Sequence, residues 1–162
     1  MSSLKTLLVA ALSLILSLNL APAQASERPL DSQALAGVTQ GKALFDINLG
    51  ELEKLPLYLQ VIEMTYDGLV AQGVTPEFVI AFRGAAVQFI DNSDATVPAR
   101  QQIAAQIKQL HTKGIRLEAC SIATELFGVD NGQLLPGITP VGNTFISLIG
   151  YQAQGYATVV IM

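Results

Sequence analysis

The chain of 162 residues carries 13 acidic against 9 basic side chains, which gives a formal net charge of −4. A surface with this balance disfavours nucleic acid and anionic lipid as partners, because both are themselves negatively charged. The sequence has one cysteine and one histidine, so it excludes an intrachain disulfide and favours neither a metal site nor a cofactor.

Residues 1–25 have the pattern of a secretory signal peptide. An apolar run over residues 7–20 follows a basic residue, and the small side chains of Ala23 and Ala25 suit signal peptidase. The run is shorter than the roughly 20 residues that a membrane-spanning helix needs. We therefore expect general secretory export with cleavage after Ala25, and a periplasmic or secreted mature protein without a membrane span.

Residues 26–40 mix polar residues with a proline and a glycine and show no sustained period. This composition predicts a flexible leader. The remaining residues, 41–162, are close to the commonest size of a single domain, and we expect them to form one.

From residue 41 onward, the chain repeats a glycine that ends one element and an apolar strand that follows it at once. The repeat predicts strands at residues 42–48, 78–82, 115–119, 138–141 and 156–161. Apolar residues at three- and four-residue steps predict helices between them, at residues 55–69, at 98–113, from 121 and from 143 or 144. Pro56 and Pro98 suit the first turns of two of these helices.

The apolar runs at residues 78–82 and 158–161 lack the alternation of a strand that has one face in water. Such runs are typical of strands that are covered on both faces, which favours a parallel sheet with helices on both sides. The predicted fold class is α/β, a three-layer α/β/α arrangement around a five-stranded, mostly parallel sheet.

Polar residues that follow the strands should gather at one edge of this sheet, because the carboxyl ends of parallel strands meet there. The residues in these positions are Asp46, Asn48, Arg83, Gly84, Cys120, Ser121 and Asn143. We take Cys120 as the candidate catalytic residue and the other six as candidate substrate-binding residues.

Cys120 stands where a predicted strand passes into a short helix that begins at Ser121. We expect the strand end to expose its side chain, and the free N–H groups of the helix to favour the thiolate. The alternative is a small apolar residue packed in the core, as free cysteines often are. Arg83 would favour the thiolate further, unless it serves only in an ion pair with Asp46 or Asp91.

Arg116, Glu118 and Cys120 alternate with apolar residues and so share one face of their strand. We expect a simple Arg116–Glu118 surface pair, rather than an edge strand or a subunit contact. His111 precedes the opposite end of this strand, too far from Cys120 for a catalytic couple within one subunit.

The chain resembles the DsrE/DsrF-like family in five segments, which occur in the family's order. They are Phe-Asp-Ile-Asn at 45–48, Ala-Phe-Arg-Gly-Ala-Ala-Val at 81–87, Gly-Ile-Arg-Leu-Glu-Ala-Cys at 114–120, Leu-Leu-Pro-Gly-Ile-Thr-Pro-Val-Gly at 134–142 and Tyr-Gln-Ala-Gln-Gly-Tyr at 151–156. The resemblance covers about residues 41–161. One departure is Arg83, where many relatives have histidine before the glycine.

The resemblance implies a small α/β protein that forms homo-oligomers and, in the sulfur-relay branch, carries sulfur as a persulfide on a cysteine after the third strand. Cys120 matches that position. Arg83 and the N–H groups near Ser121 would then stabilise the sulfur anion, while Asp46, Asn48 and Asn143 shape the pocket. Because the chain has no second cysteine, sulfur would pass between Cys120 and a thiol-bearing partner protein or an inorganic sulfur species.

These observations leave three functional hypotheses. The first is a sulfur carrier, whose only enzymatic activity would be sulfur transfer through Cys120. The second is a non-catalytic oligomeric module that binds a small ligand or another exported protein. The third is a thiol redox sensor, which the absence of a resolving cysteine disfavours.

Overall fold

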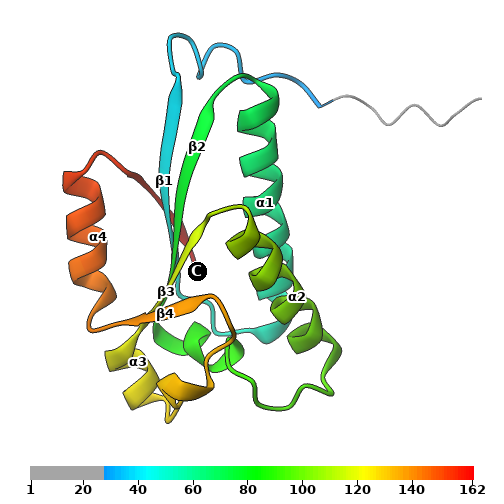
Figure 1. The fold of residues 1–162 in the computed structure, drawn as a ribbon, viewed down its shortest axis with the longest axis vertical. Coiled ribbons are helices and arrows are strands. Elements are labelled where there is room, and N and C mark those ends of the chain that lie inside the picture. Colours follow the sequence, from blue (N-terminus) through cyan, green and yellow to red (C-terminus); the bar gives the residue numbers. More distant parts are fainter. Residues whose placement is uncertain (1–27) are drawn as a thin grey trace, which may run out of the picture. The chain divides into compact units, whose positions relative to one another are not determined.

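Five parallel strands form a single sheet in the order β4-β3-β2-β1-β5 (Figure 1). The protein is represented by a computed structural model, which describes residues 28–162. The strands are β1 (Gln40–Ile47), β2 (Thr75–Phe82), β3 (Arg116–Cys120), β4 (Ile138–Val141) and β5 (Ala157–Ile161). All five strands expected from the sequence are present. β1 and β2 begin earlier than expected because they pair with each other from Gln40 and Thr75 onward.

Four α-helices cover the two faces and the carboxyl end of the sheet. They are α1 (Leu55–Ala71), α2 (Pro98–Thr112), α3 (Ser121–Leu126) and α4 (Thr144–Ala153). Pro56 and Pro98 lie in the first turns of α1 and α2, where a missing backbone N–H is tolerated. Asn143 caps α4, because its side chain accepts a hydrogen bond from the backbone N–H of Phe145.

The helices divide between the two faces and so make three layers. Leu59 and Ile62 of α1 and Ile107 of α2 belong to the larger apolar core on one face. Leu148 and Tyr151 of α4 pack against a smaller cluster on the other face. Figure 1 shows α1 and α2 on one side of the strands and α4 on the opposite side. The predicted α/β/α class is confirmed.

Three short 3-10 helices, which the sequence did not indicate, complete the regular structure of residues 28–162: η1 (Leu52–Lys54), η2 (Gly84–Phe89) and η3 (Asn131–Gln133). The signal peptide expected at residues 1–25 lies outside the described residues. The described part of the expected leader contains a turn over residues 32–37, in which the N–H of Leu35 donates to the carbonyl of Asp31 at 3.0 Å. Among residues 28–162, no helix combines the length and the apolar character needed to cross a bilayer.

The expectation that residues 158–161 are covered on both faces is wrong. β5 is an edge strand that pairs with β1, and Val159 and Val160 are 43% and 52% exposed. A cavity of about 390 Å³ lies between this edge and α1, where Tyr58 and Val61 line it. An apolar run therefore did not distinguish a central strand from an edge strand here. Residues 78–82, by contrast, are fully buried as predicted.

The expected Arg116–Glu118 pair is also wrong. Arg116 forms an ion pair with Glu77 of β2 at 2.7 Å and donates a hydrogen bond to the Tyr156 hydroxyl at 2.5 Å. Glu118 instead accepts a hydrogen bond from the Tyr151 hydroxyl of α4 at 2.6 Å. Because β3 lies between β2 and β4, these side chains meet neighbouring elements, and the edge-strand alternative is excluded.

Candidate functional site

Three strands end at the same level on the carboxyl edge of the sheet. In the register that joins β1, β2 and β3, the last partners are Ile47, Phe82 and Ala119, and β3 continues for one more residue, Cys120, which pairs with β4. The next residue in each strand direction is Asn48, Arg83 or Cys120. Because neighbouring strands lie about 4.8 Å apart, this register brings the three side chains to one place.

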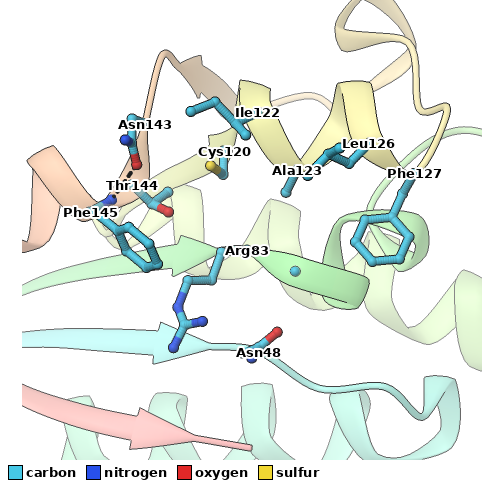
Figure 2. Close-up of a pocket in the computed structure, with 11 residues that line it drawn as sticks. Asn48, Arg83, Cys120, Ile122, Ala123, Leu126, Phe127, Asn143, Thr144 and Phe145 are labelled. Carbon is cyan, nitrogen blue, oxygen red and sulfur yellow. Dashed lines mark hydrogen bonds between the residues drawn. The ribbon is translucent and has the colours of Figure 1, made fainter.

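A cavity of about 270 Å³ lies at this edge (Figure 2). Its lining includes five of the seven residues expected from the sequence, which are Asn48, Arg83, Gly84, Cys120 and Asn143. The lining also includes residues that the sequence did not single out, which are Ile122, Ala123, Leu126, Phe127, Thr144 and Phe145. Most of the additional residues come from α3 and from the first turn of α4.

Cys120 is the last residue of β3 and is 6% exposed. Its expected exposure is therefore wrong, because Val87 of η2 and Ala123 of α3 pack beside it. The residue is nevertheless not enclosed in the main core, since it lines the cavity. His111 does not line this cavity and lies at the opposite end of β3, so the two residues form no couple, as the sequence indicated.

Two opposing effects set the pKa of the Cys120 thiol. Burial raises it, whereas the Thr144 hydroxyl and the backbone N–H groups of Thr144, Ala123 and Ile122 lower it by favouring the thiolate. The donors outweigh burial, and the net pKa lies below its ordinary value. A larger fraction of Cys120 is therefore thiolate at neutral pH than for an ordinary cysteine.

Thr144 is the polar residue among the lining residues that sequence reasoning missed. Its side chain is fully buried, and Oγ1 has no hydrogen-bond partner of regular geometry among the described residues. Figure 2 shows the Cys120 sulfur directed toward Thr144. With no other partner in the described part of the chain, the hydroxyl is free to donate to the sulfur, and it favours the thiolate. Its position directly after the Asn143 cap is the sequence signal that could have identified it.

Arg83 is held by Asp46 in a two-pronged ion pair. Arg83 Nε donates to Asp46 Oδ1 at 2.6 Å, and the second donor reaches Oδ2 at 2.9 Å. These hydrogen bonds, and the nearby negative charge of the Cys120 thiolate, raise the pKa of Arg83. The guanidinium also lies 5.5 Å from the centre of the Phe145 ring. Arg83 therefore forms the ion pair with Asp46 and also lies near enough to Cys120 to interact with its charge.

Asp46 and Ser121 do not line the cavity. Asp46 is 3% exposed and acts through Arg83. The Ser121 hydroxyl accepts a hydrogen bond from Asn131 at 3.2 Å, away from the cavity. Asn143 does line it, but its side-chain oxygen is engaged in capping α4. The expected roles of these three side chains in shaping or lining the pocket are therefore indirect or structural.

The mouth of the cavity is apolar. Ile122, Leu126, Phe127 and Phe145 line it and are between 43% and 78% exposed. Exposed apolar side chains that gather around a pocket are typical of binding sites. Within the described residues, no group of three or more histidine, cysteine, aspartate or glutamate side chains is arranged to hold a metal ion.

Comparison with known proteins identifies the family. The model of the DsrE/DsrF-like family matches residues 42–161, which is most of the chain. The chain belongs to the DsrE/DsrF-like family. Membership suggests a sulfur-relay-type role for this DsrE/DsrF-like protein.

Two individual proteins are similar to this DsrE/DsrF-like chain. An uncharacterized protein of Aquifex aeolicus (strain VF5) is 28% identical over 124 residues, which are 73% of this chain and 55% of that protein. The chain thus spans about half the length of this curated relative. The solved structure of MTH1491, a protein of unknown function from Methanobacterium thermoautotrophicum, has a TM-score of 0.60 at 18% identity and covers 76% of this chain and 99% of its own. This likeness supports the fold.

Replacing the Thr144 hydroxyl by a methyl group is expected to weaken the thiolate. In Thr144→Val, the pKa of Cys120 should rise, so that alkylation by iodoacetamide reaches its plateau only at higher pH. The free energy of unfolding should stay unchanged or increase by up to about 1–2 kcal/mol, because a buried unpaired hydroxyl is removed. Thr144→Ser keeps the hydroxyl and is the control. An alkylation profile of Thr144→Val that overlays the wild-type profile would contradict this role.

Proposed function

We propose that this protein carries sulfur as a persulfide on Cys120. The observation that supports this most is the setting of the thiol, which lines an open cavity while several donors lower its pKa. A low-pKa, reachable thiolate is the form of cysteine that attacks sulfur. Membership of the DsrE/DsrF-like family agrees with this chemistry.

Loading and unloading each exchange one sulfur–sulfur bond for another. The Cys120 thiolate attacks the outer, zero-valent sulfur of a donor, forms an Sγ–S bond, and displaces the rest of the donor with the electron pair of the broken bond. A second thiolate then attacks the outer sulfur of the Cys120 persulfide, and Cys120 leaves as thiolate. Neither step needs an external oxidant or reductant, since the sulfur atom moves with its oxidation state unchanged.

The site contains groups suited to both forms of the carrier. The N–H groups of Ile122, Ala123 and Thr144 favour a negative charge on Cys120, and the same groups would stabilise the persulfide anion. The Thr144 hydroxyl, which has no regular hydrogen-bond partner among the described residues, could donate to Cys120 Sγ in the free form and to the added sulfur in the loaded form. The positive charge of Arg83 also favours an anion on Cys120, although hydrogen bonds to Asp46 hold the guanidinium in place.

The acceptor must be another molecule, because the chain has no second cysteine to resolve the persulfide. We propose a thiol-bearing partner protein or an inorganic sulfur species in this role, acting on a homo-oligomer of the chain. The proposal includes export through the signal peptide and action in the periplasm or outside the cell. Mass measurement of the mature protein from cell fractions, with Ser26 as the expected first residue, tests the export.

Incubation of the reduced protein with polysulfide, followed by intact-mass measurement, tests sulfur carriage. We expect an added mass of one or more sulfur atoms that is removed by a thiol reductant and is absent from Cys120→Ser. Alkylation of the untreated protein by iodoacetamide is the control for access. A wild-type protein whose Cys120 is alkylated but never gains sulfur would refute the proposal.

A second candidate function is a binding module without sulfur chemistry. The observation in its favour is the exposed apolar mouth formed by Ile122, Leu126, Phe127 and Phe145, which is larger than a sulfur atom requires. Cys120→Ser separates the two functions. If ligand binding and the cellular phenotype survive the loss of the thiol, the binding module is the better description.

A further inference from the structure

The cavity beside Cys120 is much larger than its proposed cargo. Its volume is about 270 Å³, whereas a molecule in liquid water occupies about 30 Å³. The volume is slightly below the roughly 300–1,000 Å³ found for sites that hold drug-sized ligands, which suits a smaller organic molecule. The cavity therefore has room for an organic substituent bonded to the sulfur that carries the transferred atom.

The walls of the cavity select for an apolar body. Ile122, Leu126, Phe127 and Phe145 provide most of the lining side chains that reach its mouth. Contact with such side chains favours an aliphatic or aromatic group, because binding removes apolar surface of both the ligand and the protein from water.

The cavity offers no uncompensated positive charge. Among the described residues that line it, Arg83 is the one charged side chain. Both carboxylate oxygens of Asp46 already bind its guanidinium, and the Phe145 ring lies against it. A dianion such as thiosulfate would lose water without gaining a free cation, which makes it a poor ligand for this cavity.

One hydroxyl group lies beside the sulfur at this end of the site. Thr144 lines the cavity, and its Oγ1 is buried with no regular hydrogen-bond partner in the described part of the chain. Together with nearby backbone N–H groups, it can stabilise a single negative charge that is spread over a sulfur chain. The site thus combines donors beside the sulfur with apolar side chains around them, and Figure 2 shows Phe145 on one side of Cys120 and Leu126 and Phe127 on the other.

We propose that the sulfur donor of this site is an organic hydropersulfide with an apolar substituent, R–S–SH, rather than thiosulfate. This inference rests on the proposed sulfur-carrier function and specifies its substrate class. The Cys120 thiolate attacks the terminal sulfur and forms an Sγ–S bond. The bond between the two donor sulfurs breaks, and its electron pair leaves on R–S⁻ while the hydrogen stays on the transferred sulfur.

The test compares two donors on the full-length protein. Loading of Cys120 by benzyl hydropersulfide and by thiosulfate is followed by intact mass, and each rate is divided by the rate for a short cysteine peptide at equal thiolate concentration. We expect the normalised rate for benzyl hydropersulfide to be about tenfold higher or more, which is within the range that apolar pockets discriminate. Equal normalised rates, or a faster reaction with thiosulfate, would overturn the inference and leave sulfur carriage standing.

A pair of surface variants tests whether the apolar mouth causes the preference. Leu126→Ser removes an exposed leucine from the mouth and should lower the ratio of the benzyl hydropersulfide rate to the thiosulfate rate. Leu57→Ser removes an exposed leucine of α1 that does not line the cavity, and it should leave this ratio unchanged. An unchanged ratio in Leu126→Ser would also count against the inference. If neither donor loads a Cys120 that iodoacetamide alkylates, the sulfur-carrier proposal itself fails, and this inference fails with it.

Discussion

Asp46→Ala is expected to lower the free energy of unfolding by about 2–4 kcal/mol. The Asp46 side chain is 5% exposed and that of Arg83 is 20% exposed, so the variant leaves a largely buried guanidinium without its carboxylate. Removing one partner of a buried pair costs more than the pair contributes, because the remaining charge is left without compensation. Urea denaturation of the variant and the wild type measures the difference.

Two further variants identify the cause of this loss. Asp67→Ala breaks an ion pair with Lys113 in which Asp67 is 59% exposed, and it should cost at most about 1 kcal/mol. The double variant Asp46→Ala/Arg83→Met removes both charges and should recover part of the stability. If Asp46→Ala is no more destabilising than Asp67→Ala, the buried pair has no special structural role.

Asp46→Ala should also change the chemistry of Cys120. The thiolate raises the pKa of Arg83, and by reciprocity Arg83 favours the thiolate. Without Asp46, Cys120 would be the main negative partner of Arg83, so the pKa of Cys120 should fall and alkylation should reach its plateau at lower pH. Arg83→Met should shift the profile in the opposite direction. If the pKa of Cys120 shifts in the same direction in Asp46→Ala and in Arg83→Met, the proposed electrostatic coupling is contradicted.

Gly84→Ala is expected to cost about 2–3 kcal/mol of stability and to slow the loading of Cys120. Gly84 has a φ of +54°, which is unfavourable for any residue with a Cβ. A Cβ at this position would lie 1.9 Å from Asn48 Oδ1, so Asn48 would be forced to move at the cavity. Thermal or urea denaturation and the rate of sulfur loading measure the two effects.

Gly114→Ala is the matched control, because Gly114 has a φ of +81° and a Cβ there would meet nothing within 4 Å. It should show only the cost of the left-handed backbone, about 1–2 kcal/mol. The double variant Gly84→Ala/Asn48→Ala removes the collision between the two side chains. Its loss of stability should be similar to that of Gly114→Ala. If Gly84→Ala loses no more stability than Gly114→Ala, Asn48 moves away from the new methyl group without a measurable energetic cost.

Much of the fold could be predicted because its signals are local. Glycines with positive φ end the elements before β2 and β3, and prolines stand in the first turns of α1 and α2. Buried runs such as residues 78–82 follow from composition alone. The exposure of Val159 and Val160 could not be predicted, because it depends on β5 being at the edge of the sheet.

The candidate site was only partly accessible to the same reasoning. Cys120, Arg83 and Asn48 follow parallel strands, and their proximity follows from that position. The position of Thr144 after the Asn143 cap was readable, but its burial and its missing hydrogen-bond partner among the described residues could not be inferred, since both depend on how α4 packs. Ser121 has a suitable position in the sequence, but its hydroxyl accepts a hydrogen bond from Asn131 instead.

The sequence by itself determined which segments become strands and helices, and that a single thiol stands at a strand end. Periodicity, glycine and proline act over a few residues, and these short-range preferences are written directly in the chain. Only the tertiary structure decided the strand order, the partner of Arg116, and the balance of burial and donors that sets the pKa of Cys120. Each of these depends on atoms from distant parts of the chain, whose distances exist only after the layers have packed.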